Sequence, residues 1–236
     1  CGGGATTIDV WRRAPAGSVV QGLDLSPALI EVARRRPGAD HREVAFEVAD
    51  MGTARRRGAP FDRLVSRLGI MFFGDPPAAF ANLRRWLAPG GRFAFAVWGP
   101  LEDNLWMTAT RAAVADALDV PPIDPSAPGP FRYGNAGPLV SLLEGAGFVD
   151  VTVTDWRQAL PMGDRPGAAA AAHFALAAFS SFEERLAQAG GDACVRARAS
   201  LTARFAEHEQ DGTVRMPARV HIIGGLAGPG GGSHHD

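Results

Sequence analysis

Short apolar runs alternate with amphipathic runs from the start of the chain to Trp98. Brief runs rich in Val, Phe and Leu and bounded by Gly, Pro or Asp are typical of buried strands, whereas apolar residues three and four positions apart are typical of helices. Strands that alternate with helices favour an α/β domain built on a mostly parallel sheet. The pattern predicts strands at 18–23, 44–48, 61–66 and 92–98, the last two buried, and helices at 5–13, 27–36 and 76–87.

The alternation of strand and helix breaks after Trp98. Asn104 is placed to cap a helix at 105–118, and a proline-rich loop then runs to Pro130. This inserted segment carries several aromatic residues, so we expect it to form a lid that shields a bound molecule from water. Beyond it, the pattern predicts helices at 138–147, 167–189 and 192–209, an alternating strand at 148–156 and a final strand at 219–226.

The first stretch of the chain has the layout of a nucleotide-binding turn. Gly2, Gly3 and Gly4 allow a sharp bend and a close approach of the backbone to a ligand, and a helix follows at once. Asp24 ends the next strand, 20 residues after Gly4. A carboxylate at about that distance is placed to accept hydrogen bonds from both ribose hydroxyls of a nucleotide.

Five segments in order carry a family resemblance: CGGGATT, GLDLSP, FEVAD, FDRLVSRLGIMFF and WLAPGGRFAFAVW. The chain resembles the class I S-adenosylmethionine-dependent methyltransferases, and most closely the small-molecule branch that includes the ubiquinone and menaquinone C-methyltransferases. The resemblance implies a doubly wound, Rossmann-like, mostly parallel seven-stranded sheet whose antiparallel last strand lies between the two preceding strands. In that family a strand with an acidic residue comes before the glycine turn. We therefore expect the chain to be a fragment whose first strand is missing upstream of Cys1.

The resemblance also implies the cofactor, S-adenosylmethionine, and the residues that bind it. Asp50 is expected to accept a hydrogen bond from the adenine amine while Met51 packs against the ring, and the backbone at Ser66 is expected near the amino-acid end. A simple loop acid is the other interpretation of Asp50. The expected cofactor residues are Cys1, Gly2, Gly4, Asp24, Leu25, Asp50, Met51, Ser66 and Arg67.

The methyl acceptor is expected to be a small organic molecule with an oxygen, nitrogen or carbon nucleophile. The loop at 68–73 is strongly apolar for a connection, so we expect it to line the acceptor pocket, although covering the core would explain the phenylalanines equally well. Trp98 and Trp106, which are aromatic residues at the predicted lid, are also expected to line this pocket. The expected pocket residues are Met71, Phe72, Phe73, Trp98 and Trp106.

No motif singles out a catalytic base, so the catalytic residue is left unassigned. A sulfonium methyl needs a nucleophile held in line, and an amine or thiolate acceptor needs no base, whereas a hydroxyl or aromatic carbon usually does. Tyr133 is a weak candidate because it lies beside the lid. The other candidates are His41, His173, His208 and His221.

We expect one methyltransferase domain at 1–226 and a disordered, low-complexity tail at 227–236. Within the domain, 1–98 is expected to bind the cofactor, 99–135 to form the lid, and 136–226 to supply acceptor-side helices. The two histidines of the tail are not expected to form a metal site, because no further ligands accompany them.

The amino-acid composition argues against several other classes of function. All 24 basic residues are Arg, so the chain has no lysine for a Schiff base or for a P-loop. The net charge of −1 gives no electrostatic argument for a nucleic-acid partner. No apolar run is long enough to span a membrane. The two cysteines, Cys1 and Cys194, form no CxxC pair and favour a reducing, cytoplasmic location; the oligomeric state is left open.

Two alternatives to methyl transfer stay open on the residues alone. A nicotinamide-dependent oxidoreductase would use the same glycine turn and acid, but Thr7 stands where the third glycine of GxGxxG belongs. A protein that binds the cofactor without turnover would keep every feature above.

Overall fold

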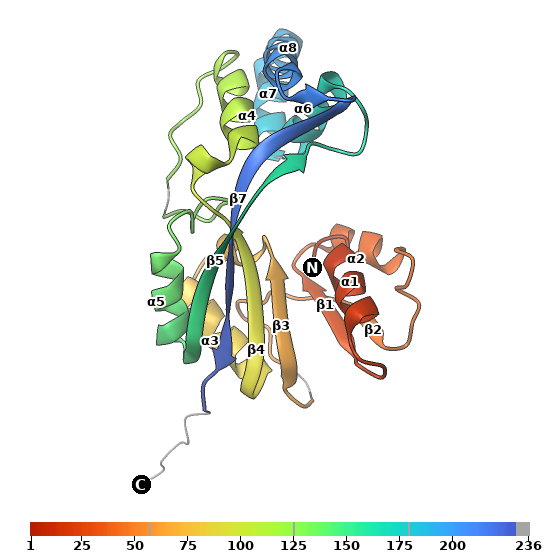
Figure 1. The fold of residues 1–236 in the computed structure, drawn as a ribbon, viewed down its shortest axis with the longest axis vertical. Helices are drawn as coiled ribbons and strands as arrows, with labels where there is room; N and C mark the ends of the chain where they lie inside the picture. Colours follow the sequence, from red (N-terminus) through yellow and green to blue (C-terminus); the bar gives the residue numbers. More distant parts are fainter. Residues whose placement is uncertain (57, 125, 179, 230–236) are drawn as a thin grey trace. The chain divides into compact units, whose positions relative to one another are not determined.

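The computed structural model describes residues 1–56, 58–124, 126–178 and 180–229, which form two compact units (Figure 1). Unit 1 contains Cys1–Val97, Ala136–Thr154 and Ile222–Asp236, and unit 2 contains Trp98–Asn135 and Asp155–His221. The chain therefore passes from one unit to the other four times. The predicted tail at 227–236 lies outside the described residues from 230 onward.

The first part of unit 1 is a small α/β layer in which two helices cover a parallel pair of strands. Its elements are α1 (Ala5–Arg13), β1 (Val20–Asp24), α2 (Pro27–Arg34) and β2 (Val44–Val48). Ser26 caps α2 as predicted, because its hydroxyl accepts a 3.3 Å hydrogen bond from the Leu29 N–H. Five apolar side chains form the core of this layer: Ile8, Ile30, Ala33, Val44 and Phe46.

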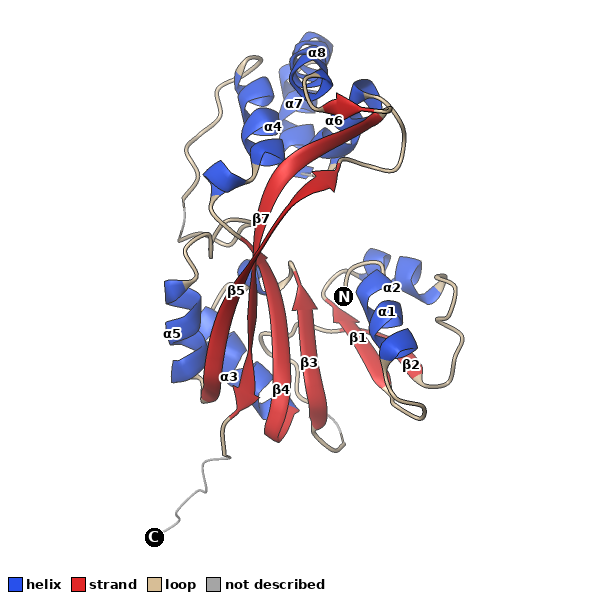
Figure 2. Cartoon of the chain, viewed as in Figure 1, coloured by secondary structure: helices blue, strands red, loops and turns tan. Residues whose placement is uncertain are grey.

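The second part of unit 1 is a mixed sheet in the order β3-β4-β7-β5 (Figure 2). β3 (Phe61–Arg67) and β4 (Leu87–Trp98) are parallel, and the antiparallel last strand, β7 (Thr213–Ala227), lies between β4 and β5 (Phe148–Pro161), as expected from the resemblance. The remaining elements of this part are η1 (Ile70–Phe72), α3 (Pro76–Trp86), which Asp75 caps as predicted, and α5 (Gly137–Gly145).

The mixed α/β sheet with its antiparallel last strand is confirmed, whereas the expected count of seven strands, with the first missing from this chain, is not. Within the described part of the chain, β1 pairs with β2 alone and β3 pairs with β4 alone, so the strands form two separate sheets. The prediction that both 61–66 and 92–98 are buried strands was also wrong in part. Val65 is 46% exposed and Ala94 is exposed, whereas Phe93 and Phe95 are buried, because only one face of β4 packs into the core.

Unit 2 is a helical layer built on the extended ends of β5 and β7. Three helices pack against α8 (Gly191–Ala206): α4 (Leu105–Ala115), α6 (Ala168–Ala177) and α7 (Ser180–Ala189). Fully buried alanines such as Ala172, Ala175 and Ala197 let the helices approach closely around Leu201 and Phe205. The other elements are η2 (Leu101–Asp103) and β6 (Glu209–Gln210), which pairs with the start of β7.

Two predictions for this layer were wrong. The single helix predicted at 167–189 is two helices, α6 and α7, since each of them packs separately on α8. Asn104 does not cap α4; its side chain turns instead to the backbone of other segments. The Asn104 amide has both a donor and an acceptor, so it binds the Pro100 carbonyl and the Arg219 N–H at the same time.

Candidate functional site

The glycine turn has the geometry that the sequence predicts. Gly4 adopts a left-handed conformation (φ 81°) at the N-terminus of α1. A Cβ placed on Gly4 would lie 2.9 Å from both the Ala33 Cβ and the Phe46 ring. No side chain caps the first N–H groups of α1, so this end of the helix can favour a negatively charged group.

Asp24 lies at the carboxyl end of β1 and is tied to the glycine turn. One carboxylate oxygen accepts from the Gly2 N–H (2.7 Å) and from the Cys1 backbone nitrogen (3.0 Å), and the other accepts from the Ser26 N–H (3.0 Å). Burial acts to raise the pKa of Asp24, but the Ser26, Cys1 and Gly2 donors together hold the pKa below its ordinary value. Asp24 is therefore ionised at neutral pH, and part of its capacity to accept hydrogen bonds remains for a ligand hydroxyl.

Asp50 lies at the same edge, after β2, because the Ala49 N–H donates to the Asp24 carbonyl (2.9 Å). Its carboxylate accepts from the Gly52 N–H (2.8 Å) and faces the Thr53 hydroxyl (3.3 Å), so it shapes its own turn. Both the loop-acid interpretation and a contact with adenine are compatible with this exposed carboxylate.

Two apolar residues flank this edge of the small sheet. Leu25 is 70% exposed, so its side chain is open to a planar group. Met51 is half-buried, and its carbonyl accepts a 2.9 Å bond from the amide of Asn82 on α3. Asn82 also binds the Ala54 carbonyl at 2.8 Å and thereby fixes the loop after β2.

The remaining cofactor residues and the predicted pocket loop follow β3. Ser66 and Arg67 are the last residues of β3, and Leu68 then adopts φ 58°, which turns the chain sharply. Met71 is buried and Phe73 contacts Phe80 edge to face with centroids 5.7 Å apart. Phe72 is 53% exposed, so of the three loop residues it is the most accessible to a ligand.

Unit 2 contains the other predicted residues. Trp98 and Trp106 contact each other with ring centroids 5.0 Å apart, and both pack on the core of unit 2. Tyr133 is buried at 2% exposure, and this burial raises the pKa of its phenol. A buried phenol with a raised pKa stays protonated at neutral pH, so it suits hydrogen-bond donation better than proton abstraction.

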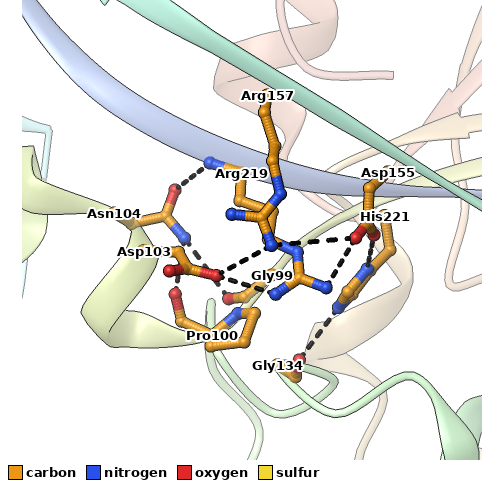
Figure 3. Close-up of polar contacts among 9 residues, drawn as sticks. All are labelled: Gly99, Pro100, Asp103, Asn104, Gly134, Asp155, Arg157, Arg219 and His221. Carbon is orange, nitrogen blue, oxygen red and sulfur yellow. Dashed lines mark hydrogen bonds and ion pairs between the residues drawn. The ribbon is translucent and has the colours of Figure 1, made fainter.

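Sequence reasoning missed a polar cluster in unit 2, shown in Figure 3. Arg219 on β7 donates to the carboxylates of Asp103 (2.7 Å) and Asp155 (2.5 Å). Asn104, fully buried, donates to the Pro100 carbonyl (2.8 Å) and accepts from the Arg219 N–H (3.2 Å). The members come from four distant segments, so no local motif could have revealed the cluster.

His221 belongs to this cluster and differs from the other candidate bases. Its Nδ1 lies 2.7 Å from Asp155 Oδ1, and its Nε2 lies 2.9 Å from the Gly134 carbonyl oxygen. Both ring nitrogens are thus engaged, which leaves neither for an acceptor proton. His173 is exposed on α6, and His41 packs against Trp11 with centroids 4.1 Å apart.

The described residues contain no group of three or more His, Cys, Asp or Glu side chains placed to hold a metal ion. None of the helices in the described ranges combines the length and hydropathy that crossing a bilayer requires.

Comparison with known proteins finds a family match for the first part of the chain. Residues 1–91 match the family described as "Methyltransferase domain". The chain is 30% identical over 143 residues to the demethylmenaquinone methyltransferase of Deinococcus radiodurans, a match that covers 61% of this chain and 56% of that protein. The chain spans about half the length of the curated relatives it matches.

Solved structures show the same fold. A methyltransferase from Bacillus halodurans aligns with a TM-score of 0.58 at 14% identity, covering 97% of this chain and 90% of that one. The phosphoethanolamine N-methyltransferase 2 of Haemonchus contortus, solved with S-adenosyl-L-methionine, aligns with a TM-score of 0.55 at 16% identity, covering 97% and 47%. With the glycine turn, Asp24 and the strand order described above, these likenesses show a methyltransferase domain match over residues 1–91 and a methyltransferase fold for the chain.

Proposed function

We propose that this protein transfers a methyl group from S-adenosylmethionine to a small organic acceptor. The observation that carries the proposal is the link between Asp24 and the glycine turn, in which an ionised carboxylate at the end of β1 holds the Gly2 N–H at 2.7 Å. This arrangement puts a hydroxyl-binding carboxylate beside a backbone turn that only glycine can form.

The residues of unit 1 fit the proposed cofactor. A Cβ on Gly4 would overlap Ala33 and Phe46, so the turn requires glycine where α1 packs on the core, and Asp24 beside it keeps accepting capacity for the ribose. Leu25 offers exposed apolar surface to the adenine. When bound, S-adenosylmethionine supplies an electrophilic methyl group, and the chain's task is to hold the acceptor in line with it and to exclude water.

We propose that the loop at 68–73 contacts the acceptor, with Phe72 as its accessible residue. The other residues predicted for the acceptor side, Trp98, Trp106 and Tyr133, belong to unit 2, where Trp106 and Tyr133 are buried. Tyr133 would donate a hydrogen bond to an acceptor oxygen or to a neighbouring group, in keeping with its raised pKa. We also propose that residues 99–135 form a lid and that residues 136–226 supply the acceptor-side helices.

A glycine on β1 separates this site from a nicotinamide site. In the GxGxxG turn the third glycine lets the helix approach the strand closely. Here Thr7 occupies that helix position, and Gly22 on β1 provides the space instead, since a Cβ on Gly22 would lie 2.7 Å from the Thr7 hydroxyl. The turn thus departs from the GxGxxG sequence of nicotinamide sites while keeping the close helix–strand approach.

The direct test is turnover with isotope-labelled S-adenosylmethionine. We expect S-adenosylhomocysteine to form when a demethylated menaquinone analogue or phosphoethanolamine, the acceptors named by the relatives, is supplied as a first panel. Gly4→Ala is the inactive control, because the added Cβ would overlap Ala33 and Phe46. Binding of S-adenosylhomocysteine without turnover on a wide panel would favour a cofactor-binding protein and count against the enzyme.

A further inference from the structure

All four passages of the chain between the units lie close in sequence to the polar cluster of Figure 3. The passages fall at 97/98, 135/136, 154/155 and 221/222. Gly99, Gly134, Asp155 and His221 belong to the cluster and lie within two residues of these passages. The cluster therefore joins, within unit 2, the segments by which the chain enters and leaves that unit.

His221 makes the link between two of these segments. The imidazole lies between the Asp155 carboxylate on β5 and the Gly134 carbonyl in the loop after α4, and it is only 4% exposed. The Gly134 backbone lies close to Pro100, since a Cβ on Gly134 would lie 3.3 Å from the Pro100 Cα. His221 thus links the loop that carries Tyr133 to β5 and β7.

Both partners of the imidazole are acceptors. A carbonyl oxygen accepts hydrogen bonds only, and so does the Asp155 carboxylate while it is ionised. Arg219 holds the pKa of Asp155 below its ordinary value, so that the carboxylate stays ionised near neutral pH. A neutral imidazole has one N–H and would direct a lone pair at the second oxygen, whereas the imidazolium donates to both.

The charges around the ring are of both signs. On β5, Asp155 faces the ring and Arg157 lies 4.0 Å from that carboxylate; on β7, Arg219 pairs with the same carboxylate and with Asp103 of η2. The charged groups of the cluster around His221 are Asp103, Asp155, Arg157 and Arg219, and Arg132 and Tyr133 directly precede its partner Gly134 in the sequence.

We propose that His221 is a positioning residue of the methyltransferase: as an imidazolium it bridges Asp155 and Gly134 and so fixes the Tyr133 loop of the acceptor-side unit. The inference rests on the proposed function only for its effect on turnover. When the ring loses a proton, one of the two bridges is lost, and the Gly134 segment of the loop is held less firmly to β5 and β7. Binding of the cofactor in unit 1 does not involve this bridge.

The single tyrosine makes the proposal directly measurable. Tyrosine labelled with ¹³C at the ring Cζ gives one resonance, that of Tyr133, because the chain has no other tyrosine. Between pH 5 and 8 the phenol itself stays protonated, since burial raises its pKa. Histidine labelled with ¹⁵N reports in the same sample whether His221 carries one ring proton or two.

We expect two protonated ring nitrogens on His221 at the acid end, and a shift of the Tyr133 resonance that follows the loss of one of them. His221→Gln should abolish that shift, because an amide keeps one donor but does not titrate. The matched control is His173→Gln on exposed helix α6, which should keep it. An unchanged shift in His221→Gln, or a His221 with one ring proton and a static Tyr133 resonance throughout, would overturn the proposal.

Kinetics separate the inference from the proposed function. For His221→Gln we expect the acceptor KM to rise about tenfold, the size expected for losing a hydrogen bond to a charged group, and to become independent of pH, while the affinity for S-adenosylhomocysteine stays within about twofold. Equal losses in both affinities would indicate general unfolding and overturn the positioning role. If the wild-type chain neither binds the cofactor nor turns over, the proposed function fails while the resonance experiment still decides the bridge.

Discussion

The Asp24 carboxylate accepts a 2.7 Å hydrogen bond from the backbone N–H of Gly2, across 22 positions of the sequence. The bond ties the strand end to the turn that would hold the cofactor, so one side chain both shapes the site and presents a charge to it. Removing Asp24 should therefore affect ligand affinity by two routes, through the lost acceptor and through a loosened turn.

Gly4→Ala should cost both stability and binding. The substitution forces a Cβ into a left-handed conformation and into contact with Phe46, so we expect a loss of about 3 kcal/mol in the free energy of unfolding. Urea denaturation measures this directly.

Gly17→Ala is the matched control for that change. Gly17 has nearly the same φ, 84° against 81°, but a Cβ there would meet nothing within 4 Å. We expect a loss of only about 1 kcal/mol, from backbone strain alone, and unchanged cofactor affinity. Equal losses in the two variants would show that packing around Gly4 is unimportant.

Asn104→Ala should destabilise unit 2. The side chain is fully buried, donates to the Gly99 and Pro100 carbonyls and accepts from the Arg219 N–H, so its removal leaves buried backbone groups without partners. We expect a loss of about 2 to 3 kcal/mol in the free energy of unfolding. Thr108→Ala on the exposed side of the same helix, which should cost about 0.5 kcal/mol or less, is the comparison.

Acid should weaken the polar cluster through Asp155. Arg219 holds the folded-state pKa of Asp155 below the ordinary value of 3.8, so below that value the unfolded chain binds the proton more readily than the folded one. The stabilisation is complete above pH 3.8 and is lost as the pH falls through the folded-state pKa. Asp155→Asn should flatten this part of a plot of unfolding free energy against pH, and an identical slope in both proteins would contradict it.

Local signals predicted the helix starts and several strands well. Ser26 and Asp75 could be predicted as helix caps because each places a side-chain acceptor directly before a proline, within one turn of the N–H groups it binds. The strand predicted at 44–48 has the same bounds in the structure. The glycine turn and Asp24 could be placed because their relationship is encoded in a fixed spacing.

Properties set by distant partners could not be read in the same way. The apolar character of Val65 is the same whether or not something covers it, so its exposure depends on neighbours that the residue does not specify. Asn104 looked like a cap because the donor to its side-chain oxygen, the Arg219 N–H, lies 115 positions away. The sequence offered His221 only as one of several candidate bases and did not reveal its bridging position, since its two partners lie 66 and 87 positions away.

Calorimetric titration of S-adenosylhomocysteine into the wild-type chain, Asp24→Ala and Asp9→Ala tests the central claim most directly. Asp9 is an exposed acid on α1, one turn beyond the glycine turn, and serves as the charge-matched control. We predict binding to the wild type and to Asp9→Ala, an affinity roughly tenfold to a hundredfold weaker in Asp24→Ala, and no heat with NAD. Equal affinity in all three proteins, or a preference for NAD, would contradict the assignment of this site.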